Sequence, residues 1–90
     1  MEHVWVLDFN AENEDTGDYM GWRTVHATKE SAVQLMFARF DELGVDYDSP
    51  ALEVTASSEA DDGSECKDFT ASQWGWERIS YGVQRTEVLA

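Results

Sequence analysis

The segment Thr28–Gly44, TKESAVQLMFARFDELG, decides the fold, because no other stretch of the chain keeps a helical pattern of apolar residues over such a length. The apolar residues recur at spacings of three and four, which places them on one face of an α-helix. They are Val33, Met36, Phe37, Phe40 and Leu43, and the stripe is widened by Ala32, Leu35 and Ala38. We therefore predict an α-helix over about residues 29–43.

Both ends of this segment carry residues that begin and end helices. The hydroxyl of Thr28 can accept a hydrogen bond from a first-turn backbone N–H, and Glu30 puts negative charge at the positive end of the helix dipole. Gly44 can adopt the left-handed conformation that ends a helix.

The remaining segments alternate between strand-like sequence and acidic connections. The predicted strands are residues 3–10, 19–27, 51–57 and 74–89, and the predicted acidic loops are residues 11–18, 45–50 and 58–68. The order β-β-α-β-β favours an α+β two-layer sandwich, in which an antiparallel sheet of about four strands carries the helix on one face. A chain of 90 residues is expected to form a single domain, residues 1–90.

The last predicted strand contains two tryptophans and two glycines. Strict alternation puts Trp74 and Trp76 on the face opposite Ile79, Tyr81 and Val83, and it assigns bulges or bends to Gly75 and Gly82. The whole chain has more large aromatic side chains than one short helix can cover. We expect about half of them in the core and the remainder in a patch on the uncovered sheet face, which fits a foreign partner or a second copy.

The charge of the chain is strongly unbalanced, with 19 Asp and Glu against 6 Lys and Arg and a formal net charge of −13. Direct binding of nucleic acid requires a basic stripe, and an anionic membrane requires positive charge, so neither is an expected partner. The natural complement is a basic protein surface. Lysine is scarce, so acidity that serves only solubility in a salt-adapted cytoplasm stays an open alternative.

Many of the acidic residues form three clusters, which lie in or next to the three predicted loops. We predict partner binding through the first and third clusters together with the paired tryptophans. The predicted site residues are Glu12, Glu14, Asp15, Asp18, Glu59, Asp61, Asp62, Glu65, Trp74 and Trp76. The second cluster consists of Asp41, Glu42, Asp46 and Asp48.

The same acidic loops also raise the possibility of calcium binding, which the EF-hand pattern tests. An EF-hand loop needs glycine at its sixth position and a bidentate glutamate at its twelfth. With Gly17 at the sixth position the twelfth is Arg23, and with Gly63 there the twelfth is Phe69, so both frames fail. No metal site or cofactor is predicted, and a small metal-binding protein is kept as a lesser alternative.

Candidate catalytic groups are few. His3 and His26 lie on the first two predicted strands and can approach each other, but zinc needs three or four ligands. A Cys66–His26 nucleophile pair has no supporting motif, and the chain has no phosphate-binding loop or catalytic triad signature. We predict no catalytic residue and no enzymatic activity.

Cysteine usage and the N-terminal sequence both point to the cytoplasm. Cys66 is the only cysteine, so no disulfide can form within the chain. The first residues lack the basic and apolar regions of a signal peptide, and no apolar run approaches the length of a membrane span.

The chain resembles small acidic inhibitors encoded by phages, such as anti-CRISPR proteins and other nucleic-acid mimics. The resemblance lies in overall character, namely about ninety residues, strong acidity, many aromatic residues and an α+β pattern without a catalytic motif. It implies an inhibitor that blocks the basic groove of a host defence complex, or of another nucleic-acid-binding complex, in the host cytoplasm.

Overall fold

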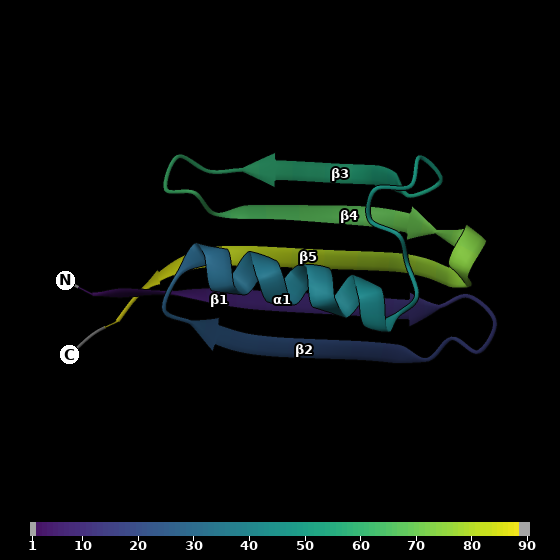
Figure 1. Cartoon of the computed structure of the whole chain (residues 1–90), viewed down its shortest axis with the longest axis horizontal. Coiled ribbons are helices and arrows are strands. Elements are labelled where there is room, and N and C mark those ends of the chain that lie inside the picture. Colours follow the sequence, from purple (N-terminus) through teal and green to yellow (C-terminus); the bar gives the residue numbers. More distant parts are fainter. Residues whose placement is uncertain (1, 89–90) are drawn as a thin grey trace.

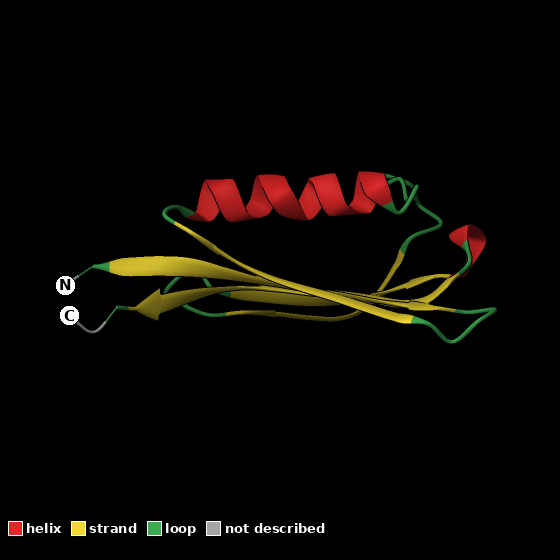
Figure 2. Ribbon diagram, turned by 90° about the horizontal axis from the view of Figure 1, so that it is seen from below, coloured by secondary structure: helices red, strands yellow, loops and turns green. Residues whose placement is uncertain are grey.

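The computed structural model describes residues 2–88, and within them the strands form one five-stranded antiparallel sheet with a helix across one face (Figures 1 and 2). The elements in chain order are β1 (His3–Asn13), β2 (Tyr19–His26), α1 (Lys29–Glu42), β3 (Glu53–Glu59), β4 (Glu65–Ala71), the 3-10 helix η1 (Ser72–Trp74) and β5 (Trp76–Glu87). The strand order across the sheet is β2-β1-β5-β4-β3. The predicted α+β two-layer class is confirmed.

Helix α1 begins and ends close to the predicted positions. The backbone N–H of Ser31 donates to the Thr28 hydroxyl at 3.1 Å, so Thr28 is the N-cap. At the other end Gly44 has a φ of 75°, and the backbone N–H of Val45 donates to the Phe40 carbonyl at 3.0 Å. This is the Schellman arrangement, which satisfies carbonyls that the end of the helix leaves free.

The core lies between α1 and the covered face of the sheet. Ala32, Met36 and Phe40 are the buried residues of the helix. The ring of Phe40 meets the rings of Phe9 on β1 and Phe69 on β4 edge to face, at centroid distances of 5.2 and 5.5 Å. The sheet contributes the other large buried side chains of this layer: Trp5, Leu7, Trp76, Ile79, Tyr81 and Val83. No described helix is long and apolar enough to cross a membrane.

The sheet has one strand more than predicted, because residues 58–68 are not a single loop. Strand β3 continues to Glu59 and β4 already begins at Glu65. A tight turn joins them, with Gly63 at a φ of 92° and the Ala60 N–H donating to the Ser64 carbonyl at 2.8 Å. Polar residues can form strands here because an antiparallel sheet tolerates solvent on its surface.

The final strand also departs from strict alternation. Glu12 pairs with Arg78 while Asn13 pairs with Trp76, so Glu77 is an extra residue in β5. This bulge places Trp76 on the same face as Ile79, and the predicted placement of Trp76 on the opposite face is wrong. Gly75, at a φ of 82°, lies at the predicted bend.

Gly82 does not mark a bulge, because it pairs in regular register with Asp8 and Cys66. The predicted strand end at Leu89 lies outside the described residues, and β5 ends at Glu87.

The expected aromatic patch on the uncovered sheet face is not found among the described residues. Tyr19, 68% exposed, is the one aromatic side chain on that face. The connection from α1 to β3 extends the cover provided by the helix, because Tyr47 packs against Phe40 and Phe69. Phe37, 42% exposed, lies at the edge of this cover and meets Tyr47 edge to face.

Candidate partner-binding surface

Exposed carboxylates gather most densely at one end of the molecule, where the β1–β2 turn, the last turn of α1 and the α1–β3 connection lie together (Figure 1). We call this surface the acidic end. Its exposed residues are Glu14, Asp15, Asp18, Asp41, Glu42, Asp46, Asp48, Glu53 and Glu77. The surface combines the first and second acidic clusters of the sequence, which are far apart along the chain.

The β1–β2 turn holds its carboxylates on an ordered backbone. The side-chain oxygen of Asn13 accepts hydrogen bonds from the N–H groups of Asp15 and Thr16 at 2.9 and 3.0 Å. The N–H of Asp18 donates to the Thr16 hydroxyl at 3.2 Å. Because the backbone groups are bonded within the turn, the carboxylates of Asp15 and Asp18 are left to face solvent.

The α1–β3 connection alternates between apolar and acidic residues. Val45 is buried and Tyr47 packs against the core, while Asp46 and Asp48 are exposed. The Asp48 N–H donates to the Asp46 carboxylate at 3.0 Å. The apolar residues therefore anchor this connection and turn its acidic residues outward.

Most of the acidic end is not neutralised by basic side chains. Of its carboxylates, Glu42 is the one held in an ion pair within the described chain, with Arg39 at 2.9 Å. The other described ion pairs are Arg23–Asp8, Lys29–Glu65 and Arg78–Asp68, which join residues outside the acidic end. The unpaired carboxylates therefore produce a local excess of negative charge.

The third acidic cluster lies at the opposite end of the molecule, whose longest extent is 45 Å (Figure 1). Glu59, Asp61 and Asp62 are exposed around the β3–β4 turn. The Ser64 N–H donates to the Asp62 carboxylate at 2.9 Å, and this bond lowers the pKa of Asp62, with smaller contributions from the Ser64 side chain and Arg85. The predicted site therefore does not form one continuous surface.

Three of the predicted site residues are engaged inside the fold. Glu65 is half-buried, lies 3.7 Å from the Lys29 ammonium and accepts a hydrogen bond from the Tyr81 hydroxyl at 3.4 Å. Trp76 is 9% exposed and donates its indole N–H to the Leu43 carbonyl at 3.4 Å. Trp74 is half-buried and packs against the core. The two tryptophans do not form the exposed contact expected of them, because the bulge in β5 turns Trp76 inward.

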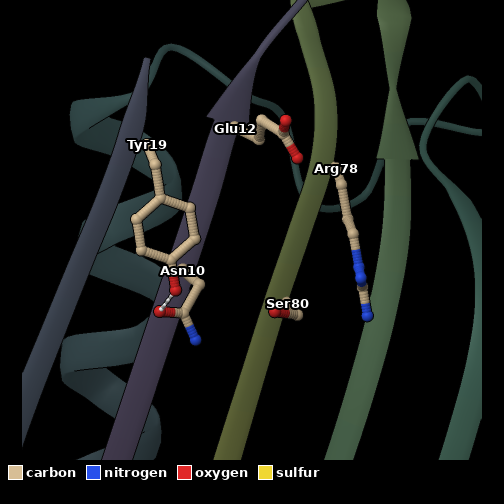
Figure 3. A pocket seen from close by; sticks show the side chains of 5 residues that line it. All are labelled: Asn10, Glu12, Tyr19, Arg78 and Ser80. Carbon is tan, nitrogen blue, oxygen red and sulfur yellow. Dashed lines mark hydrogen bonds between the residues drawn. The ribbon is translucent and has the colours of Figure 1, made fainter. Parts of the chain in front are cut away.

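The uncovered face of the sheet holds a shallow pocket next to the acidic end (Figure 3). Its volume is about 270 Å³, and its lining side chains are Asn10, Glu12, Tyr19, Arg78 and Ser80. The Tyr19 hydroxyl donates to the Asn10 side-chain oxygen at 2.5 Å. Arg78 donates to Asp68 at 3.0 Å, so the one cation in the pocket wall already has a counter-ion. Glu12 is the predicted site residue that lies here.

The candidate nucleophile pair is not assembled. Cys66 is exposed and lies beside Gly82 on the uncovered sheet face, whereas His26 pairs with Trp5 on the covered side. The His26 ring nitrogens lie 2.7 Å from the Thr24 hydroxyl and 2.9 Å from the Ser31 hydroxyl. Within residues 2–88 no three His, Cys, Asp or Glu side chains are grouped so that they could hold a metal ion.

Glu53 and Glu77 belong to the acidic end, although neither is among the site residues predicted from the sequence. Glu53 is the first residue of β3, and Glu77 is the bulged residue of β5. Because Glu53 and Glu77 lie where their strands begin, both are close to the turns that form the acidic end. Only the general rule that strand ends adjoin loops could have suggested them from the sequence.

A scan against protein-family models matches no family, and searches of curated proteins and of solved structures find no significant match.

Proposed function

We propose that this protein is a non-enzymatic binding protein whose acidic end engages the basic surface of another protein. In the more specific form of the proposal, it is an inhibitor that mimics nucleic acid. It would then occupy the basic groove of a CRISPR-type defence complex or of another nucleic-acid-binding complex.

A single observation carries this proposal, namely that exposed carboxylates from separate chain segments converge on one end and that only Glu42 among them has an ion-pair partner in the described chain. Like charges held together on a folded surface repel one another, and a basic partner relieves that repulsion. Long-range attraction between such surfaces raises the association rate, and salt screens it.

Competition for DNA tests the proposal. We expect the protein to displace labelled double-stranded DNA from a CRISPR effector complex or another nucleic-acid-binding complex at low salt, and to lose this effect at high salt. A triple variant, Glu14→Gln, Asp15→Asn and Asp48→Asn, removes three charges from the acidic end. It should compete at least tenfold less well, a loss that corresponds to about 1.4 kcal/mol.

The matched control removes the same number of charges elsewhere. The variant Glu2→Gln, Glu30→Gln and Glu87→Gln has the same net charge as the first variant. Its substituted residues lie just before β1, in the first turn of α1 and at the end of β5, and Figure 1 shows these parts of the three elements away from the acidic end. It should compete as well as the unmodified protein. Equal losses in both triple variants, or no displacement from any complex of a panel, would contradict the proposal.

A homodimer formed through the uncovered sheet face requires exposed tryptophans there, and we do not propose it. Trp76 is buried and Trp74 packs against the core, so the uncovered sheet face lacks the aromatic surface that this alternative required.

A further inference from the structure

Strand β3 is an edge strand that buries none of its own side chains. It pairs with β4 on one side and is the last strand of the sheet on the other. All residues from Glu53 to Glu59 are exposed. Helix α1 packs over β1, β2 and β5, and in Figure 1 β3 lies beyond it. The outer edge of β3 is therefore open to another chain.

The hydrogen-bond pattern identifies which backbone groups of β3 point outward. The Ala60 N–H donates toward β4, to the Ser64 carbonyl. Successive residues of an antiparallel strand alternate in the direction of their N–H and C=O groups. The backbone N–H and C=O groups of Ser58 and Ala56 thus point toward β4. The backbone N–H and C=O groups of Ser57 and Glu59 point to the free edge. The register shift lies between Val54 and Ala56, which leaves the stretch from Ala56 onward regular.

The two edge strands of the sheet differ in how well they are protected against pairing with a further strand. Strand β2, the other edge, lies partly under α1 and carries Arg23 in its middle. The centre of β3 is Ala56, Ser57 and Ser58, which are small and uncharged, and β3 contains neither lysine nor proline. Charged side chains, proline and β-bulges are among the means by which proteins prevent an edge strand from pairing. The register shift of β3 lies between Val54 and Ala56, so the stretch from Ala56 to Ser58 is the part of this edge that has none of these features.

Charges at the two ends of β3 identify the kind of chain that fits this edge. Glu53 begins the strand within the acidic end, and Glu59, Asp61 and Asp62 lie at its other end. The six steps from Glu53 to Glu59, at roughly 3.3 Å each, separate the two ends of β3 by about 20 Å. A second copy of the protein would bring a further charge of −13 to this edge, so repulsion disfavours it.

We propose that the free edge of β3 binds an extended segment of the basic partner by strand addition, with lysine or arginine side chains of that segment placed on the carboxylates at both ends of β3. Backbone hydrogen bonds to Ser57 and Glu59 hold the added strand, and the terminal carboxylates select a basic segment. This inference rests on the proposed binding of a basic partner. It also explains how acidic clusters at opposite ends of the molecule can contact one partner.

Amide hydrogen exchange with a defined peptide tests the inference. The probe is the peptide RRVTVTVRR, and its controls are EEVTVTVEE and a version of the basic peptide that is N-methylated at its valines. Binding of the basic peptide should slow exchange at the Ser57 and Glu59 amides at least tenfold. Exchange at Gly21 and Arg23, whose amides lie on the other edge strand, should not change. Neither control peptide should give protection.

Two variants separate the backbone of β3 from its side chains. Ser57→Pro removes one outward N–H donor and leaves the bonds to β4 intact, so it should weaken peptide binding about tenfold, as expected for one hydrogen bond. Ser57→Ala keeps the donor and should bind as the unmodified protein does. The exchange measurement on the unmodified protein remains decisive if Ser57→Pro does not fold.

Several outcomes would overturn strand addition. Salt-dependent peptide binding without protection of Ser57 and Glu59 would reject it, while basic-partner binding through the acidic end would stand. Protection of these amides in concentrated protein without peptide would make a second copy the occupant of the edge. Absence of peptide binding would also reject strand addition, and the DNA competition experiment would then decide the role of the acidic end separately.

Discussion

At the scale of single residues, the largest effect of burial on a titratable group is found at Tyr81, on the covered face of the sheet. Tyr81 is 3% exposed, stacks on Phe69 at 6.1 Å between ring centroids and donates its hydroxyl to Glu65. Burial raises the pKa of the Tyr81 phenol far above its usual value of 10, and the neighbouring Tyr47 and Glu65 add to this shift. A charged phenolate in this position would lose its hydration and face a carboxylate, so the folded state keeps the neutral form.

The raised pKa of Tyr81 predicts that the folded protein loses stability in alkaline solution. The pKa of Tyr81 is higher in the folded state than in the unfolded state. The neutral Tyr81 phenol therefore contributes fully to the free energy of unfolding below pH 10, and this contribution declines as the pH rises beyond that value. Urea unfolding across this pH range should show a falling free energy of unfolding, and Tyr81→Phe should make the fall shallower. An equally steep fall in the Tyr81→Phe variant would show that other groups cause the alkaline decline.

At the level of elements, α1 provides most of the cover of the sheet but does not extend over all of it. The helix packs over β1, β2 and β5, and only Phe69 and Ala71 are buried in the β3–β4 hairpin. Stability is therefore concentrated where α1 lies, and the hairpin is held mainly by its pairing with β5. The free edge of β3 therefore lies outside the part of the sheet that α1 covers.

Two phenylalanines of α1 allow a test of where the stability of the fold is concentrated. Phe40 is fully buried between Phe9 and Phe69, so Phe40→Ala should cost about 3–5 kcal/mol of the free energy of unfolding, because a cavity replaces the ring. Phe37 is 42% exposed and contacts Tyr47 at the edge of the core, so Phe37→Ala should cost about 1 kcal/mol or less. Denaturant unfolding of both variants measures the difference. Equal costs would contradict the inward orientation of Phe40 and the edge position of Phe37.

For the molecule as a whole, the dominant property is a charge of −13 that the fold distributes unevenly. The described ion pairs lie mainly on the sheet, whereas most exposed carboxylates at the two ends have no ion-pair partner among residues 2–88. Such an arrangement costs stability in the free protein, because like charges are held close together. At the acidic end, relief of this repulsion would favour the basic partner that we propose.

Salt should therefore stabilise the free protein. Raising the sodium chloride concentration screens the repulsion among exposed carboxylates and should increase the free energy of unfolding. At low salt the triple variant Glu14→Gln, Asp15→Asn and Asp48→Asn should be more stable than the unmodified protein, because it has three fewer negative charges at the acidic end. At high salt this difference should shrink. A stability independent of salt would contradict self-repulsion as a significant term.

Much of the fold follows from local patterns in the sequence. The stripe on residues 29–43, the hydroxyl of Thr28 and Gly44 predict α1 nearly to the residue, because the causes of helix formation lie within one helical segment. The same holds for the β1–β2 hairpin and for the alternation of its side chains. The excess of acidic residues, which is the basis of the candidate site, is also a property of composition.

The structure differs from the sequence predictions where residues far apart in the chain pair with each other. Residues 65–71 become a strand because β5 pairs with them, and no local pattern contains that partner. Trp76 is buried because Asn13 pairs with it across a bulge, which single-strand alternation cannot anticipate. Long-range pairing also divides the acidic clusters between two ends and leaves the edge of β3 open. Composition and local periodicity therefore specify the helix, the hairpin and the charge, whereas strand pairing over long sequence distances specifies which surfaces that charge occupies.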